Sequence, residues 1–279
     1  MSTAARRVMA LAAAGLTHSA DHLAGGTLVL LGLFGFAGGV GTTALGPGGV
    51  LVTIGLYLLS ALPPAAVSGT AIATNLGAAV LGTGAFMRSG QLRGAPTRRV
   101  AAVLIAAAIL GTPVGVLANA HVSGAAFGIL LGVCVAAIGA LLYVREHQRR
   151  AASRATARMS APGWTVIAPI GLGVAVVSGL FGLGGQLLSV PLLISAGIAM
   201  LPALGAAQAQ SIVIAGVGTI GYALRGAVAW SLVLVMVIPL LAGTLTGWRI
   251  AQAIPADRLR SVLAVVLVAT GAYLILRST

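Results

Sequence analysis

The sequence contains no lysine, three acidic residues and one cysteine among its 279 residues. The lone Cys134 excludes a disulfide scaffold, because it has no partner within the chain. Charged residues make up only 7% of the chain, whereas a soluble protein draws about a quarter of its residues from Asp, Glu, Lys and Arg. Such a chain cannot cover a surface that faces water, and the composition therefore excludes a soluble globular protein.

Apolar residues account for most of what is present. Hydrophobic residues make up 59% of the chain and 40 residues are glycine, which also excludes a disordered chain, since disordered segments are poor in apolar residues. The remaining class is an integral membrane protein. The net charge of +13 comes from Arg residues in short loops between apolar runs. We therefore expect these Arg residues to lie at the surface of the lipid bilayer, and we expect no nucleic-acid partner.

Ten apolar segments fall into two sets of five, and we predict an all-α, polytopic membrane helix bundle. A helix needs about 20 apolar residues to cross a bilayer. The second segment of each set is shorter and reaches only about 20 Å as a helix, against a hydrocarbon core of about 30 Å, so we expect two half-helices there. The sets are 28–44, 50–62, 65–87, 100–118 and 125–144, and 166–183, 186–200, 203–224, 230–247 and 259–276.

Glycine and proline positions recur between the two sets at offsets of 132 to 138 residues. Gly48-Gly49 aligns with Gly184-Gly185, Pro64 with Pro202, and Gly139-Ala140 with Gly271-Ala272. An odd number of crossings in each set makes the second copy enter the membrane from the opposite face. We therefore predict two membrane repeats of inverted topology, 26–144 and 164–279.

The segment between the repeats, 145–163, is predicted to be a basic cytoplasmic loop, because cytoplasmic loops collect Arg and Lys. Counting crossings outward from it places twelve of the sixteen Arg residues on the same side. The N-terminal segment 1–25 fits either a signal sequence or an interfacial helix. Trp164, Trp230 and Trp248 fit interface anchors better than substrate contacts. Whether the chain forms a homodimer stays open.

Two glycine-rich breaks are the first candidate site. Gly46-Pro47-Gly48-Gly49 and Gly182-Leu183-Gly184-Gly185 each precede a short segment. Irregular backbone at membrane depth is tolerated only inside protein or beside a water-filled cavity, and a helix that restarts there presents free N–H groups and a positive dipole end to an anion. We predict backbone contacts to substrate from Gly48, Gly49, Gly184 and Gly185. The alternative interpretation is close helix packing at small residues.

Neutral polar side chains near the start of the third and eighth segments are the second candidate site. Helical spacing lets each group present several donors on one side, and neutral donors bind an anion weakly enough to release it. Interhelical hydrogen bonding is the equally weighted alternative. We predict substrate contacts from Ser68, Thr70, Asn75, Gln208, Gln210 and Ser211, and Thr74 lies among them.

No acidic residue lies within any of the ten segments, which disfavours proton or cation transport through the core. His18, Asp21 and His22 are spaced like the start of some nickel and cobalt permeases, but no second His or Cys cluster supports a metal site. Motifs of hydrolases, metalloproteases and P-loop enzymes are absent. We expect no cofactor, no metal and no catalytic residues. An intramembrane enzyme, a lipid-phosphate flippase and a metal-ion permease remain as alternatives.

The breaks and the residues around them resemble the TauE/SafE family of sulfite and sulfonate exporters. The resemblance spans about residues 26–276 and rests on both glycine-rich breaks, Pro191, Leu62-Pro63-Pro64 and Ser68-Gly69-Thr70. Gln186 stands where family members often have a third glycine. The resemblance implies a permease of the bacterial inner membrane for sulfite, a sulfonate or a related organic anion. We expect its substrate site between two inverted halves that alternate in access.

Overall fold

The computed structural model describes residues 25–45, 48–88, 94–152, 163–253 and 256–278, and all regular structure in these ranges is helical. This confirms the predicted all-α class. Seven of these helices are long and apolar enough to cross a membrane, namely α2, α4, α5, α6, α7, α9 and α10. The helices are α2 (Gly25–Leu45), α3 (Gly49–Leu59), α4 (Pro64–Arg88), α5 (Ala95–Asn119), α6 (Gly124–Ala152), α7 (Trp164–Phe181), α8 (Gln186–Ser195), α9 (Met200–Leu224), α10 (Trp230–Ala253) and α11 (Ala256–Ser278).

The second helix of each set is short, as the segment lengths predict. α3 has 11 residues and α8 has 10, so each rises about 15 Å, half of the hydrocarbon core. α8 ends at Ser195 rather than at residue 200, because Gly197 adopts φ +99 and turns the chain. α11 has 23 residues and covers the tenth predicted segment, 259–276.

The basic segment after the first set differs from the expected loop. α6 continues to Ala152, eight residues beyond the predicted end of the fifth segment. The added residues are Arg, Glu, His, Gln and Ala, and most of these are strong helix formers. The helix therefore extends past its apolar part, and the rest of the segment, 153–162, lies outside the described residues.

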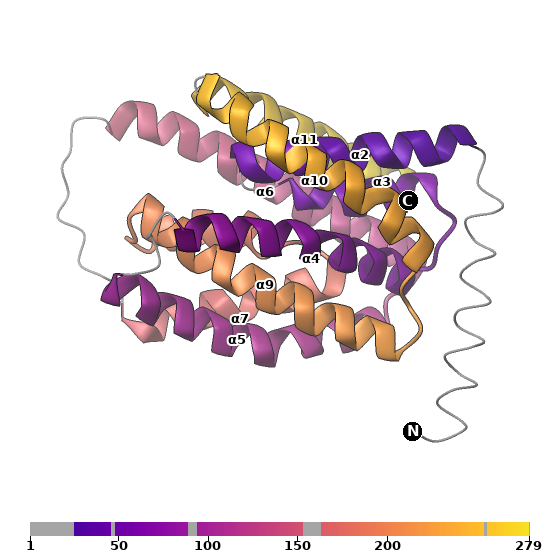
Figure 1. Ribbon diagram of the computed structural model, residues 1–279, viewed down its shortest axis with the longest axis horizontal. Coiled ribbons are helices and arrows are strands. Elements are labelled where there is room, and N and C mark those ends of the chain that lie inside the picture. Colours follow the sequence, from indigo (N-terminus) through magenta and orange to yellow (C-terminus); the bar gives the residue numbers. More distant parts are fainter. Residues whose placement is uncertain (1–24, 46–47, 89–93, 153–162, 254–255, 279) are drawn as a thin grey trace.

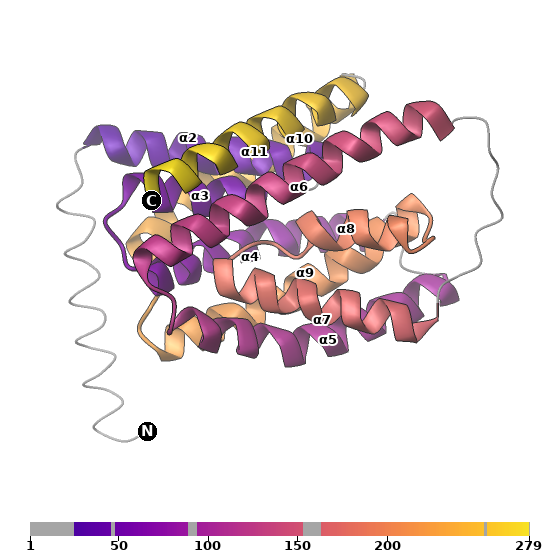
Figure 2. The ribbon, with the colours of Figure 1, turned by 180° about the vertical axis from the view of Figure 1, so that it is seen from behind.

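The ten described helices form two groups that run along the same long axis (Figures 1 and 2). One group contains α2, α3, α6, α10 and α11, and the other contains α4, α5, α7, α8 and α9. Each group mixes helices from both halves of the sequence. The first long helix of each half packs mainly against the fourth helix of the other half, α2 on α10 and α7 on α5, while α4 packs on α9 and α6 on α11. If each helix is replaced by its counterpart in the other half, the same set of helix pairs results. The inverted topology of the two halves stays a prediction.

Glycines bring the backbones of these helix pairs into contact. A Cβ atom at Gly39 of α2 would lie 2.0 Å from the carbonyl oxygen of Leu240 in α10, and one at Gly115 of α5 would lie 2.1 Å from that of Val176 in α7. No side chain fits at such a distance from a rigid backbone. The small residues therefore set the helix spacing, as in other membrane bundles.

The outer surface of the bundle is apolar, as contact with lipid requires. Leu110, Leu224 and Ile238 are more than two thirds exposed. Trp164 and Trp230 are also exposed, at the first residues of α7 and α10. These positions suit the predicted role of interface anchors, whereas the side chain of Trp248 lies outside the described part of the chain.

A Gly115→Ala substitution tests the backbone contact between α5 and α7. Because the new methyl group meets a main-chain oxygen, the helices must separate, and we expect a loss of about 2 kcal/mol in the free energy of unfolding. Thermal denaturation in detergent measures it. Gly173→Ala in α7 is the control, since nothing lies within 4 Å of its Cβ position. Equal melting temperatures for the two variants would contradict the role given to Gly115.

Candidate functional site

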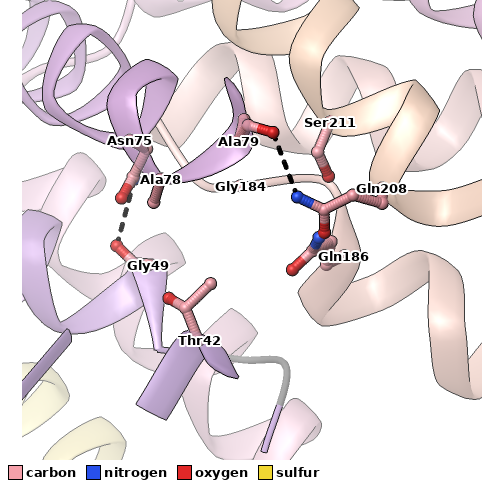
Figure 3. A pocket seen from close by; sticks show the side chains of 9 residues that line it. All are labelled: Thr42, Gly49, Asn75, Ala78, Ala79, Gly184, Gln186, Gln208 and Ser211. Atoms are coloured by element: carbon pink, nitrogen blue, oxygen red, sulfur yellow. Dashed lines mark hydrogen bonds between the residues drawn. The ribbon is translucent and has the colours of Figure 1, made fainter. Parts of the chain in front are cut away.

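A small pocket lies between the two breaks (Figure 3). Its lining residues come from the end of α2, the starts of α3 and α8, the middle of α4 and the first half of α9. The pocket leaves about 20 Å³ for the centres of water-sized molecules, and one water requires roughly 10–15 Å³ on this measure. It is thus a site for one or two waters in this conformation. The lining residues are Thr42, Gly49, Asn75, Ala78, Ala79, Gly184, Gln186, Gln208 and Ser211.

The side chain of Asn75 joins the two breaks. Its Nδ2 atom donates hydrogen bonds to the carbonyl oxygens of Gly49, in the first break, and Gly182, in the second, at 3.2 Å each. Asn75 is 5% exposed, so both carbonyl groups are paired away from water. Breaks that are about 136 residues apart in the sequence therefore meet at one amide in the middle of α4.

Both short helices begin at the pocket without a side-chain cap. Gly48 precedes α3 and Gly185 precedes α8, and neither helix has a capping hydrogen bond from a side chain. Gly49 and Gln186, the first residues of the two helices, line the pocket. The pocket therefore lies at the positive ends of two helix dipoles, and none of its nine lining residues carries an acidic or basic side chain.

The second break is held in place by a separate group of side chains. The hydroxyl groups of Ser68 and Tyr222 donate to the carbonyl oxygens of Leu180 and Gly179 at 2.8 and 2.7 Å, and Asn119 donates to Leu180 at 2.7 Å. These carbonyl groups are freed where α7 ends, and lipid could not satisfy them. Gly182 follows in the left-handed region at φ +72, which favours glycine. Ser68 therefore stabilises the second break through this hydrogen bond and does not line the pocket.

The predicted site residues divide between the pocket and the surrounding packing. Gly49, Asn75, Gly184, Gln208 and Ser211 line the pocket, and Gly48, Ser68, Thr70, Gly185 and Gln210 do not.

The residues outside the pocket have structural contacts of their own. Thr70 accepts a hydrogen bond from the backbone N–H of Ala229 at 2.9 Å, and Gln210 donates to the carbonyl oxygen of Gly171 at 3.0 Å. Gly48 lies against α2, where a Cβ atom would be 2.0 Å from the carbonyl oxygen of Gly38. For these positions, close packing and interhelical hydrogen bonding describe the observed contacts.

Four lining residues are absent from the sequence prediction: Thr42, Ala78, Ala79 and Gln186. Ala78 and Ala79 lie three and four positions after Asn75, one helical turn along the same face, so helical periodicity would have found them. Gln186 directly follows the second break and is a polar residue within an apolar segment, and this pattern in the sequence would also have indicated it. Thr42 precedes the first break and is marked only by its place in the fold.

The alternative sites gain no support among the described residues. These contain no group of three His, Cys, Asp or Glu side chains that could hold a metal ion, while His18, Asp21 and His22 lie outside the described ranges. His121 is exposed at the turn between α5 and α6. Cys134 lies ten residues, about 15 Å, along α6, so the two do not form a nucleophile and base at one depth.

One family accounts for nearly the whole chain. The sequence profile described as sulfite exporter TauE/SafE matches residues 31–274, from α2 to α11, including both breaks. The chain belongs to the TauE/SafE family. This confirms the resemblance seen in the sequence and makes the chain a multi-pass membrane protein of a transporter family. Neither a curated protein nor a solved structure matches this TauE/SafE chain significantly.

An Asn75→Leu substitution tests the bridge between the breaks. It leaves the buried carbonyl oxygen of Gly182 without a donor, which costs about 1–3 kcal/mol, and it removes the link to Gly49, whose carbonyl group keeps its backbone bond within α3. We expect a lower melting temperature in detergent. Thr74→Val is the matched control, because Thr74 donates only to the carbonyl oxygen of Thr70 in its own helix. A melting temperature reduced equally by both substitutions would count against the bridge.

Proposed function

We propose that this TauE/SafE protein moves a small oxyanion, such as sulfite, a sulfonate or a related organic anion, across the bacterial inner membrane by alternating access. The observation that carries the proposal is the pocket at which the two breaks meet. Two uncapped helix starts and neutral amides border it. Helix starts of this kind attract anions through their free N–H groups and dipoles.

The chemistry of the lining suits a ligand that must also leave. A fixed positive side chain would hold an anion strongly, whereas helix dipoles and amide groups bind it with weaker partial charges. Asn75, Gln208 and Ser211 are each at most 5% exposed, so these partial charges act in a medium of low dielectric constant, where they are more effective than in water.

The size of the pocket supports a mechanism with more than one conformation. A space that holds one or two waters is too small for sulfite, which has four heavy atoms, and the path to it must widen for substrate to enter. α2 and α3 border the pocket on one side, and α8 and α9 border it on the other. Rocking of these elements against each other would open the pocket first to one face of the membrane and then to the other.

Transport also fits the site better than the alternative functions. A lipid-phosphate flippase needs a groove that is open to lipid, but the polar residues of this pocket are buried. A metal-ion permease needs ligands that the described residues do not bring together. An enzyme needs a nucleophile and a base at one depth. The nine residues that line the pocket include no His, Asp, Glu or Lys side chain that could act as the base.

The arginine-rich ends of the helices suggest the orientation. The ends of α4, α6 and α10 and the starts of α5, α7 and α11 lie at the same end of the bundle (Figure 1), and most of the Arg residues of the sequence belong to these ends and their connections. By the positive-inside rule this end faces the cytoplasm.

Cysteine labelling tests this orientation. In a Cys134→Ala background, we expect a membrane-impermeant maleimide to label Ser123→Cys, at the exposed turn between α5 and α6, in intact spheroplasts. Ser153→Cys, in the segment between the repeats, should react only after the membrane is permeabilised. The reverse pattern would show that the bundle is inserted in the opposite orientation.

Flux into proteoliposomes tests the transport function with sulfite, thiosulfate, a sulfonate and a carboxylate. A methyl group at Gly82 would lie 2.1 Å from Nε2 of Gln208, and Gln208 also donates to the carbonyl oxygen of Ala79 at 3.2 Å. Gly82→Ala must therefore displace the amide, and we expect at least a tenfold loss of oxyanion flux. Gly84→Ala, which meets nothing within 4 Å, should keep the native rate.

Native flux no higher than that of empty vesicles for every anion would remove the transport proposal. Equal flux in the Gly82→Ala and Gly84→Ala variants would remove Gln208 from the substrate path.

A further inference from the structure

Gln186 differs from the other polar residues of the pocket because its amide has no hydrogen-bond partner among the described residues. It is the first residue of α8 and is partly exposed to the pocket. The side chain extends from the second break toward the space beside Thr42 and lies on the same wall as Gln208 (Figure 3). Its two N–H groups and its carbonyl oxygen are thus available to a ligand.

The hydroxyl groups of the lining are already used within the protein. Thr42 donates its proton to the carbonyl oxygen of Gly38 at 2.8 Å, and Ser211 donates to that of Ala207 at 2.9 Å. A hydroxyl group has one proton to donate. These two residues can accept a hydrogen bond from a ligand, but they offer no donor to an anion while their helices remain intact.

The other amides are partly or wholly used as well. Nδ2 of Asn75 donates to two carbonyl groups, which uses both of its hydrogens. Nε2 of Gln208 donates to the carbonyl oxygen of Ala79 and keeps one hydrogen free. Among the nine lining residues, Gln186 therefore has the largest number of uncommitted side-chain donors, and it stands at the positive end of α8.

Gln186 also controls the free space in the pocket. Gly49 and Gly184 have no side chains, Ala78 and Ala79 present only methyl groups, and Asn75 is fixed by its two hydrogen bonds. A ligand larger than one or two waters must gain volume from a side chain that can move. Gln186 is the long side chain of the lining that no hydrogen bond holds.

We propose that Gln186 is the specificity-determining residue of the site. Its amide donates to an oxygen of the anion, and its length limits the size of the organic substituent that the site admits. This inference rests on the proposed transport function and adds to it the residue that selects a compact oxyanion over a sulfonate with a bulky organic substituent. An anion without an oxygen at this place would leave the amide unpaired, which disfavours its binding.

The test compares sulfite with butanesulfonate in proteoliposomes that contain the full chain. Gln186→Gly removes the amide and its bulk, and we expect the ratio of butanesulfonate to sulfite flux to rise at least tenfold, with a lower apparent KM for butanesulfonate. Gln186→Glu has nearly the same shape but replaces the donor by a carboxylate. We expect it to raise the apparent KM for sulfite more than tenfold, because like charges repel.

Two further variants separate the effect of the amide group from that of side-chain length and control for a general effect of substitution in α8. Gln186→Asn retains the amide on a shorter side chain, and it should raise the apparent KM for sulfite less than Gln186→Glu does while it admits butanesulfonate. Ser195→Ala, at the exposed far end of α8, should match the native chain for both anions. A flux ratio and KM values within twofold of native in the Gln186→Gly and Gln186→Glu variants, with native sulfite flux intact, would overturn the role of Gln186 alone. Loss of both fluxes in the native chain would overturn the transport function itself.

Discussion

The whole arrangement depends on the need to pair backbone polar groups that a broken helix releases at membrane depth. Lipid offers no hydrogen bonds, so each freed carbonyl group requires a partner inside the protein. Asn75 pairs the carbonyl group of Gly182, and its second bond, to Gly49, ties the first break to the second. Ser68, Asn119 and Tyr222 supply the others at the end of α7. Once these carbonyl groups are paired, the uncapped starts of α3 and α8 and the amide of Gln186 are what the pocket offers to a ligand.

Close packing of small residues brings these groups together. The contacts at Gly39 and Gly115 place α2 directly against α10 and α7 directly against α5. Each of these pairs joins the first half of the sequence to the second. As a result, the two breaks enter one interior and do not face lipid, and the substrate site proposed here belongs to neither half alone.

Helical periodicity and segment length predicted much of the fold, but only part of the site. Lengths of 13 and 15 residues separated the half-helices from the spans, because the length of a helix is proportional to its number of residues. The same reasoning selected Asn75 and Gln208 as candidate substrate contacts, and both line the pocket. It could not separate Asn75 from Ser68, which is also polar and buried on α4, because that distinction depends on which neighbouring helix each side chain faces. Ser68 faces the end of α7, whereas Asn75 faces both breaks.

The sequence by itself determined the class of protein, the positions of its helices and the two points at which helices stop and restart. These properties follow from composition and local spacing, which act over a few turns of one helix. Only the tertiary structure decided that α4 carries the amide that links the breaks, that Gln210 bonds to Gly171 away from the pocket, and that Gln186 stays unpaired within it. Such choices depend on contacts between helices that lie far apart in the chain, and no local pattern encodes which donor meets which carbonyl group.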